Sequence, residues 1–370
     1  MTKMTSLCIA LVVACVAGRA ASVPQADAHR GAEFFRTQMC VNCHAVQGQG
    51  GNTAPDLGRR YDRNYTPAGI AARMWNHAPV MWEAMKQQKI ELPKVTSDQA
   101  ADLFAFFYSV RYFEKPGEAE RGKRLFRTKH CSECHSIAAA ESRGPGTPVE
   151  KWESLSDPII LADRMWNHAD LMRAEMTARN IAWPQLTAQD LSDLLVYLQN
   201  LPETRGAKLA FTLPSSEGGA ELFKAKGCAN CHKGALALEY RLGDMTLTGV
   251  AAAMWNHNPQ MQKPHPEITL GEMRPLIGYL WAKQFFYTQG DAGRGRKTFE
   301  SKKCVVCHGD PSSGAPALGK PSEPYSAISM VSALWRHGPA MLQRMQDKHI
   351  SWPQLTQSEM ANLIAYLNSR

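Results

Sequence analysis

Four short segments with the pattern Cys-x-x-Cys-His recur along the chain, and they constrain its fold more than any other feature. They read CVNCH, CSECH, CANCH and CVVCH, and they begin at Cys40, Cys131, Cys228 and Cys304. The 370-residue sequence has ten cysteines, and eight of them stand in these four pairs. A motif that returns at intervals of 91, 97 and 76 residues indicates a row of similar small units rather than one large domain.

The chemistry that this pattern serves is covalent attachment of haem. In Cys-x-x-Cys-His the two thiols add to the haem vinyl groups, and the histidine that follows reaches the iron. A redox dithiol or a zinc site built from two Cys-x-x-Cys arms is the alternative interpretation, but a histidine follows every pair here. The sequence therefore predicts four covalently attached haems c, each with its iron. The expected attachment residues are Cys40, Cys43, Cys131, Cys134, Cys228, Cys231, Cys304 and Cys307, and the expected proximal ligands are His44, His135, His232 and His308.

The N-terminal residues 1–22 have the character of an export signal. Lys3 precedes an apolar stretch from Leu7 to Val16, and small residues follow it. The segment VVAC also resembles a bacterial lipobox, which would make Cys15 the site of a lipid anchor. Either interpretation predicts a periplasmic, extracellular or outer-membrane-associated protein. Elsewhere no apolar stretch approaches 18 residues, so we expect no transmembrane span.

The residues around each motif repeat as well. A glycine lies nine residues, and a phenylalanine five residues, before each first cysteine, which predicts a short helix with its aromatic ring inward. A second helix is expected to start at Thr66–Pro67, Asp157–Pro158, Thr246 to Thr248 and about Glu323–Pro324. A third opens at a threonine N-cap, at Thr96, Thr187, Thr269 and Thr356, and carries an aromatic residue, at Phe106, Tyr197, Tyr279 and Tyr366. We therefore expect an all-α chain with domains at 28–115, 118–203, 215–288 and 291–370.

This layout resembles that of the class I c-type cytochromes, repeated four times in tandem. The resemblance rests on the helix, the Cys-x-x-Cys-His motif, the proline-containing loop, and the final helix that opens Leu-Thr and ends Tyr-Leu. It implies an electron carrier rather than an enzyme, a one-electron relay between redox protein partners. The alternatives are a haem-bearing subunit of a membrane-bound respiratory oxidoreductase and, less favoured, a multihaem peroxidase or reductase.

The second iron ligand could be either of two residues that recur once per unit. In segments such as MWNHAPVM a histidine precedes a methionine by four residues; the histidines are His77, His168, His257 and His337, and the methionines are Met81, Met172, Met261 and Met341. Haem iron in electron carriers takes either type, and methionine raises the potential. The family resemblance implies methionine, because MWNHNPQM matches the family layout if His257 stands at the family's glycine. The histidine would then hydrogen-bond a haem propionate or a backbone carbonyl, and the tryptophan before it would pack on the haem.

The prolines in these segments favour the same choice. Pro79, Pro259 and Pro339 follow the histidine by two residues, and Asp170 takes that place in the second unit. Proline disfavours helix for the residue before it. We therefore expect the helix to break at the histidine and to restart at the proline, which would aim the methionine at the iron. Histidine ligation remains the alternative.

The net charge of the apoprotein, +8, invites a nucleic-acid or membrane interpretation. Loss of Lys3 and Arg19 with the leader, together with the propionates of four haems, brings the holoprotein close to neutral. Nucleic-acid binding is therefore not expected. Local lysine clusters such as Lys302–Lys303 are candidate docking patches for an acidic redox partner.

Overall fold

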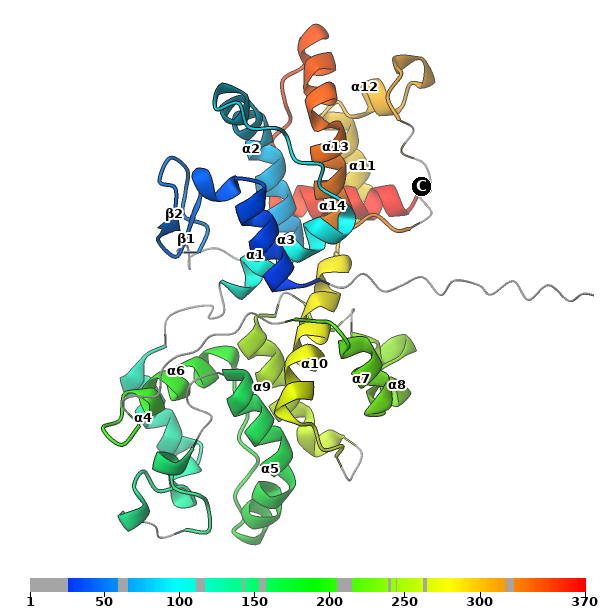
Figure 1. Cartoon of the computed structure of the whole chain (residues 1–370). Coiled ribbons are helices and arrows are strands. Elements are labelled where there is room, and N and C mark those ends of the chain that lie inside the picture. Colours follow the sequence, from blue (N-terminus) through cyan, green and yellow to red (C-terminus); the bar gives the residue numbers. More distant parts are fainter. Residues whose placement is uncertain are drawn as a thin grey trace, which may run out of the picture.

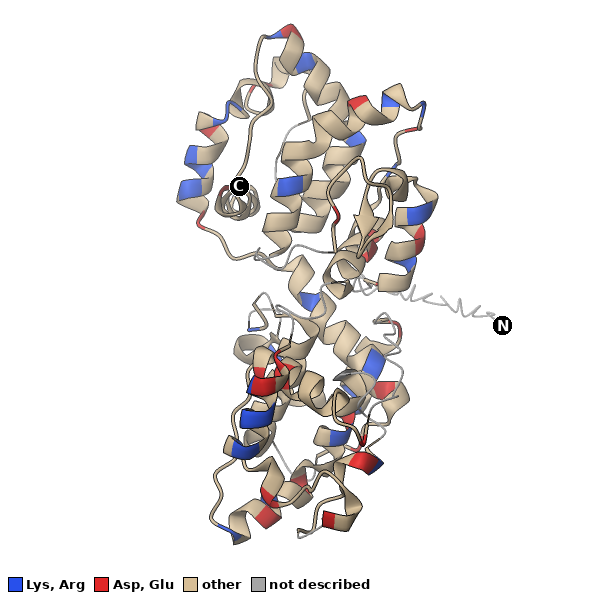
Figure 2. Ribbon diagram, turned by 90° about the vertical axis from the view of Figure 1, so that its left-hand side faces the viewer, with Lys and Arg blue, Asp and Glu red and all other residues tan. Residues whose placement is uncertain are grey.

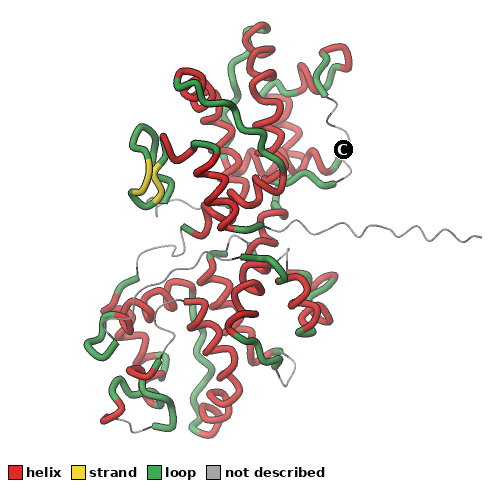
Figure 3. The backbone as a smooth tube through the Cα atoms, in the orientation of Figure 1, coloured by secondary structure: helices red, strands yellow, loops and turns green. Residues whose placement is uncertain are grey.

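The structure is a computed structural model, and it describes residues 26–58, 66–110, 117–141, 144–152, 158–204, 215–238, 241–243, 245–261, 265–316, 318 and 323–370. The predicted leader and Asp157 lie outside these residues. Nearly all regular structure is helical (Figure 3). In the described part the strands are β1 (Ala45–Val46) and β2 (Gln49–Gly50), which pair antiparallel. The predicted all-α class is confirmed.

The helices fall into four successive groups, which we call units 1 to 4. Unit 1 contains α1 (Ala28–Thr37), η1 (Cys40–Asn42), α2 (Pro67–Gln87) and α3 (Ser97–Ser109). Unit 2 contains α4 (Ala119–Thr128), η2 (Cys131–Glu133), η3 (Ala139–Glu141), η4 (Val149–Lys151), α5 (Pro158–Ala178) and α6 (Ala188–Gln199). Unit 3 contains α7 (Gly219–Ala225), α8 (Cys228–Cys231), η6 (Gly234–Leu236), α9 (Leu247–His257), η8 (Asn258–Gln260), α10 (Leu270–Lys283) and η9 (Gln284–Phe286). Unit 4 contains α11 (Ala292–Ser301), α12 (Val305–His308), η10 (Pro311–Ser313), α13 (Ala327–Asp347) and α14 (Gln357–Asn368).

In every unit the first helix crosses the last one closely. A Cβ atom on the recurrent glycine would lie within 2.2 Å of a backbone oxygen of the last helix; these glycines are Gly31, Gly122, Gly219 and Gly295. One turn later the recurrent phenylalanine meets the aromatic ring of the last helix, with centroids 5.5–6.0 Å apart in the pairs Phe35–Phe106, Phe126–Tyr197, Phe223–Tyr279 and Phe299–Tyr366. The glycine thus permits the close approach that lets the rings interlock.

The predicted helix starts are mostly confirmed. The last helix of every unit begins with a capping box at its threonine, and Thr66 and Thr246 cap α2 and α9. The start expected near Glu323–Pro324 is wrong by three residues, because Ser326 provides the capping hydroxyl and α13 opens at Ala327.

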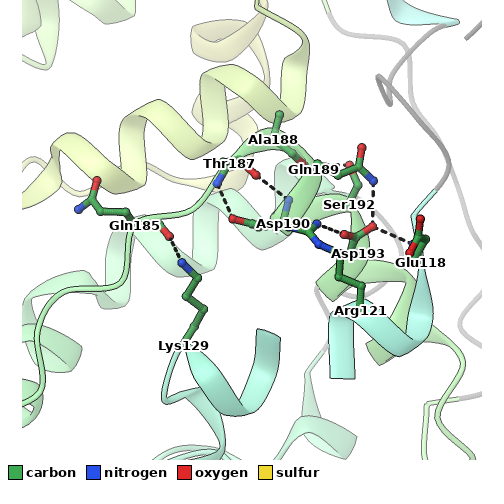
Figure 4. Close-up of polar contacts among 10 residues, drawn as sticks. All are labelled: Glu118, Arg121, Lys129, Gln185, Thr187, Ala188, Gln189, Asp190, Ser192 and Asp193. Atoms are coloured by element: carbon green, nitrogen blue, oxygen red, sulfur yellow. Dashed lines mark hydrogen bonds and ion pairs between the residues drawn. The ribbon is translucent and has the colours of Figure 1, made fainter. Parts of the chain in front are cut away.

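Polar contacts add to the crossing of first and last helices. In unit 2 the guanidinium of Arg121 on α4 pairs with both Asp190 and Asp193 on α6 (Figure 4). Asp193 also accepts a hydrogen bond from the backbone N–H of Glu118 at 2.8 Å. In unit 1 Arg30 meets Asp102 in the same way, at 2.9 Å. These carboxylates fix the register of the two helices beside the attachment motif.

The four units associate as two pairs that are nested in the sequence. Units 2 and 3 form one lobe through contacts of α5 and α6 with α9 and of α5 with α10; we call it the inner pair. Units 1 and 4 form the other lobe through contacts of α2 with α13 and α14, and we call it the outer pair. Figure 1 shows α4–α10 in the lower lobe, and α1–α3 with α11–α14 in the upper lobe. The order of the units in space therefore differs from their order in the sequence.

The two lobes meet where α10 leaves the inner pair. Ring contacts join Phe285 in η9 to Phe104 and Tyr108 on α3, with centroids 6.3 and 4.9 Å apart. Trp281 on α10 packs against Tyr108 at 5.7 Å. Unit 3 thus packs directly against unit 1. Among the described residues no helix is both long and apolar enough to cross a membrane.

The helix break expected at the histidine is wrong in three units. The helices α2, α5 and α13 run unbroken for 21 residues each, with Pro79 inside α2 and Pro339 inside α13. In unit 3, by contrast, α9 ends at His257 and a 3-10 turn that contains Pro259 follows it.

The paired unit supplies a physical reason for the continuous helix at Pro79. A proline inside a helix leaves the carbonyl one turn earlier without its usual donor. For Pro79 this is the carbonyl of Trp75, and the indole N–H of Trp352 in unit 4 donates to it at 2.9 Å. In the inner pair the indole of Trp183 donates to the carbonyl of Trp255, one turn before Pro259, at 3.1 Å. In unit 1 a tryptophan from another unit thus provides the hydrogen bond that the proline removes, whereas in unit 3 the carbonyl of Trp255 also accepts from the backbone N–H of Asn258.

Candidate haem-attachment sites

Each Cys-x-x-Cys-His motif folds into a tight turn directly after the first helix of its unit. In all four, the backbone N–H of the histidine donates to the carbonyl of the first cysteine at 2.9–3.0 Å, in the pairs His44–Cys40, His135–Cys131, His232–Cys228 and His308–Cys304. The residue before the first cysteine is left-handed in every unit, as at Met39 and Gly227. The two thiols and the imidazole are therefore gathered on one short turn, as attachment to a single haem requires.

No disulfide pairs the eight cysteines of these turns. Burial raises the pKa of Cys40, Cys131 and Cys304 to about 11, and it raises the pKa of Cys228. Each turn offers two thiols and one imidazole, which is the set of groups that attaches one haem through two thioethers.

The proximal histidines are held in one orientation by their own loops. Nδ1 lies 3.0 Å from a backbone carbonyl in three units, in the pairs His44–Pro55, His135–Thr147 and His308–Pro316. In unit 3, which has the shortest loop, Nδ1 of His232 lies 3.4 Å from the carbonyl of Leu236. A carbonyl partner fixes the hydrogen on Nδ1 and leaves Nε2 free to bind a metal.

The recurrent second histidine faces the proximal one in three units. The ring centroids are 6.2 Å apart for His44 and His77, 6.5 Å for His135 and His168, and 6.1 Å for His232 and His257. Burial first, and the facing ring second, lower the pKa of His77. Burial also lowers the pKa of His135 and His232. A lowered pKa favours the neutral imidazole, the form that binds iron, at His77, His135 and His232.

Unit 4 is arranged differently. Among its described residues no ring contact joins His308 and His337. A cavity that is partly open to solvent lies beside the attachment turn, and its lining includes Cys304, Cys307, His308, Met341 and Met345. Trp75, from unit 1, also lines this cavity. The two units of the outer pair thus meet at the cavity in which a haem of unit 4 would lie.

The recurrent methionines have different surroundings from unit to unit. Met81 packs against a small core cluster at the interface of units 1 and 4, around Trp82 and Leu334. Met172 and Met261 are half-buried against the larger cores of the inner pair and of the whole chain. Met341 lines the cavity of unit 4. Ligation by Met81, Met172 and Met261 thus remains an expectation for which the structure gives no close pairing with the proximal histidine.

Sequence analysis missed the role of the asparagine before the second histidine. Its side-chain amide donates to and accepts from the backbone of one residue in the paired unit, with all distances between 2.6 and 3.1 Å; we call this contact the asparagine clamp. The clamps are Asn76–Leu355, Asn167–Ile268 and Asn256–Leu186. The only sequence signal was the recurrence of the asparagine itself, since its partners lie 70 to 279 residues away.

The neighbouring tryptophan also contacts the paired unit. Its indole N–H donates to a backbone carbonyl there at 2.7–3.0 Å, in the pairs Trp75–Pro353, Trp166–Pro266 and Trp255–Pro184. The expectation that these tryptophans pack against the haem face stays a prediction. Their indoles also join units, and Trp75 reaches the cavity of the neighbouring unit.

Lys302 was predicted as part of a docking patch, and the structure gives it an internal role. Its ammonium group donates to the carbonyl of Gln354 at 2.7 Å and pairs with Glu359 at 3.0 Å. Lys226 of unit 3 makes the equivalent contacts with Glu267 and Glu272, each at 2.8 Å. The lysine two residues before the first cysteine thus ties the attachment turn to the cap of the last helix.

Comparison with known proteins agrees with this geometry. The family model for cytochrome c matches residues 28–111, 119–202 and 292–370, which is more than half of the chain. The chain therefore belongs to the cytochrome c family. It is a multi-domain, helical member, and its cytochrome c units make it an electron-transfer haem protein. No curated protein and no solved structure matches the chain.

Proposed function

We propose that the chain is an exported tetrahaem cytochrome that relays single electrons between redox partners. The observation that carries this is the fourfold attachment turn, in which two cysteines and a histidine with an engaged Nδ1 lie together. Bound haem supplies reversible one-electron chemistry at its iron. The chain's own residues hold each haem covalently, orient the proximal imidazole and shield the site behind the first and last helices.

Unit 3 is included although the family model does not match it. It shares with the other units the close glycine at Gly219, the Phe223–Tyr279 ring contact and the capping box at Thr269. The rings of His232 and His257 also face each other as in units 1 and 2. These features support a haem site whose loops are shortened, rather than a unit that has lost the haem.

The mass of the mature holoprotein tests the number of haems. We expect it to exceed the mass of the apo chain by four haem masses. The double variant Cys228→Ala, Cys231→Ala should lose one haem mass, as should Cys131→Ala, Cys134→Ala in a unit that the family model matches. A fully matured protein with three haems, unchanged by the substitutions in unit 3, would contradict the tetrahaem proposal.

The pairing of units supports a relay in which electrons pass between units that are neighbours in space, rather than between units that are consecutive in the sequence. Trp75 lies on the same helix as His77 and lines the cavity beside His308, so units 1 and 4 share a boundary between two candidate haem sites. The contact of Phe104 with Phe285 then joins unit 1 to unit 3. We infer fast electron exchange within each pair and transfer between pairs through units 1 and 3.

Charge supports different docking partners for the two lobes. Residues 28–115 and 291–370 of the outer pair contain 21 Lys and Arg against 14 Asp and Glu, whereas residues 118–203 and 215–288 contain 17 against 19. Figure 2 shows acidic residues on both lobes, including the lower lobe, which is the inner pair. An acidic redox partner would therefore associate with the outer pair, and its association rate would fall as salt is added.

A further inference from the structure

We propose that the chain has two kinds of iron site: His77, His168 and His257 are the second axial ligands in units 1 to 3, and Met341 is the second axial ligand in unit 4. This rests on the proposed tetrahaem function and goes beyond it. It also replaces methionine ligation by Met81, Met172 and Met261 with histidine ligation.

The spacing of the facing rings carries the argument in units 1 to 3. A metal–imidazole bond is about 2 Å long, and the ring centre lies about 1 Å farther out, so two imidazoles that bind one iron from opposite sides have centroids about 6 Å apart. The three observed distances are 6.1, 6.2 and 6.5 Å. The separation repeats in all three units, with the two rings inclined at 54–66° to each other.

The hydrogen bonds of these rings agree with an iron between them. Nδ1 of each proximal histidine points to its loop carbonyl, which leaves Nε2 for the metal. In unit 3 Nδ1 of His257 is likewise engaged, with Oε1 of Gln260 at 3.0 Å. Both rings of that unit therefore have Nε2 available for coordination.

The continuous helix separates the two candidate ligands in units 1 and 2. Met81 follows His77 by one turn of α2, and four residues of helix rise about 6 Å. Because no break redirects the chain after His77, both side chains cannot reach the same iron. The histidine ring already occupies the position opposite His44, so Met81 is left to fill the interface around Trp82.

Unit 4 lacks the features that seat the histidine elsewhere. Arg336 stands where the asparagine clamp would be, and its guanidinium donates to Ser332 within α13 at 3.1 Å. Among the described residues of unit 4 no ring contact joins His337 to His308, and Met341 lines the cavity beside His308. The absence of a clamp thus coincides with the absence of ring pairing, and the thioether of Met341 takes the place of the second imidazole.

This difference in ligands predicts different reduction potentials for the four haems. Methionine ligation raises the reduction potential of a haem relative to histidine ligation. The haem of unit 4 would therefore have the highest reduction potential of the four, and electrons from the three other haems would move to it. Because unit 4 belongs to the more basic lobe, the electron acceptor would dock there.

The optical spectrum of the oxidised holoprotein tests the assignment, after mass has established how many haems are attached. Iron–methionine coordination gives a weak charge-transfer band at the red end of the visible spectrum. We expect its intensity to correspond to one haem per chain, to vanish in Met341→Leu, and to remain in the matched variants Met345→Leu and Met172→Leu. A redox titration should resolve one high-potential haem and three low-potential haems.

The spin state of single variants tests the proposed histidine ligation in units 1 to 3. His168→Ala should turn one haem high-spin, whereas Met172→Leu should leave every haem low-spin. The proposal is overturned if the wild-type band is absent, if it survives in Met341→Leu, or if Met172→Leu rather than His168→Ala produces the high-spin haem. A holoprotein with fewer than four haems would instead count against the proposed tetrahaem function.

Discussion

The inner and outer pairs are built from the same parts, yet their interfaces differ in symmetry. In the inner pair each unit clamps the other, through Asn167 on Ile268 and Asn256 on Leu186. In the outer pair Asn76 clamps Leu355, but the reciprocal contact is a single bond from Ser332 to the carbonyl of Val95 at 2.9 Å. Where the clamp is present the second histidine faces the first, and where it is absent the ring contact is absent from the described residues. Under the proposed ligand assignment, contacts between units would help to set the second ligand of each iron.

The tryptophans of the two pairs differ in the same way. In the inner pair the rings of Trp183 and Trp255 stack at 4.0 Å. In the outer pair Trp75 stacks on Trp352 at 5.0 Å, and Trp335 directs its indole N–H to the sulfur of Met74 at 3.3 Å. In the inner pair Trp166 and Trp255 thus each donate to a carbonyl of the partner unit, whereas in the outer pair Trp75 does so and Trp335 points to a sulfur instead.

The largest effect that we expect comes from Trp183→Ala. The substitution removes the ring stacked on Trp255 and leaves the carbonyl one turn before Pro259 without its indole donor, which should cost about 3 kcal/mol of unfolding free energy. Calorimetry of the holoprotein should show a lower transition for the inner pair and an unchanged transition for the outer pair. Equal shifts of the two transition temperatures would contradict the expectation that the two pairs unfold independently.

A smaller loss should follow from Asn256→Ala. The backbone N–H and carbonyl of Leu186 would each lose a partner, at a cost of about 2 kcal/mol. The control is Asn200→Ala, because the exposed amide of Asn200 bonds only within its own unit, to the carbonyl of Val196, and its removal should change stability by less than about 0.5 kcal/mol. Similar thermal shifts in both variants would show that the clamp contributes little.

A double-mutant cycle in the outer pair isolates the hydrogen bond from the indole of Trp352 to the carbonyl of Trp75, and its dependence on Pro79. Trp352→Phe should cost about 1 kcal/mol through the carbonyl of Trp75, which has no helical donor while residue 79 is proline. In a Pro79→Ala background the alanine N–H restores that donor, so the cost of Trp352→Phe should shrink by about 1 kcal/mol. Additive effects in chemical unfolding would mean that the indole does not compensate the proline.

The smallest expected change is a gain from Arg336→Asn. An asparagine there can donate to the backbone of Val95 as its counterparts do, which should stabilise the outer pair by about 0.5–1 kcal/mol. It should also seat α13 like α2 and bring His337 toward His308, so that the methionine band weakens. A variant with the full band and no change in the calorimetric transition would separate ligand choice from the clamp.

The parts of the fold that could be predicted are those that local sequence determines. The threonine caps, the helix at the phenylalanines and the attachment turns depend on residues within about one or two helical turns of each other. The helix break was wrong because the group that compensates Pro79, the indole of Trp352, lies more than 270 residues away. Pairing of the units was not predictable for the same reason. The ligand question shares this origin, since the straightness of α2 decides which side chain can reach the site.

The nested order of the units has a consequence for how the protein is made. Contacts of the inner pair close a segment of about 70 residues, whereas those of the outer pair close one of 279. Two doublings of loop length add only about 1.2 kcal/mol of closure entropy, but the chain is made from its N-terminus, so unit 1 is complete long before unit 4 exists. The face of unit 1 that carries Trp75 and Asn76 therefore stays uncovered until unit 4 is made. Units 2 and 3 associate first, and their association shortens the length of flexible chain between units 1 and 4. A chain that stopped after unit 3 would carry a finished inner lobe and an orphaned first unit, with its apolar face open to aggregation.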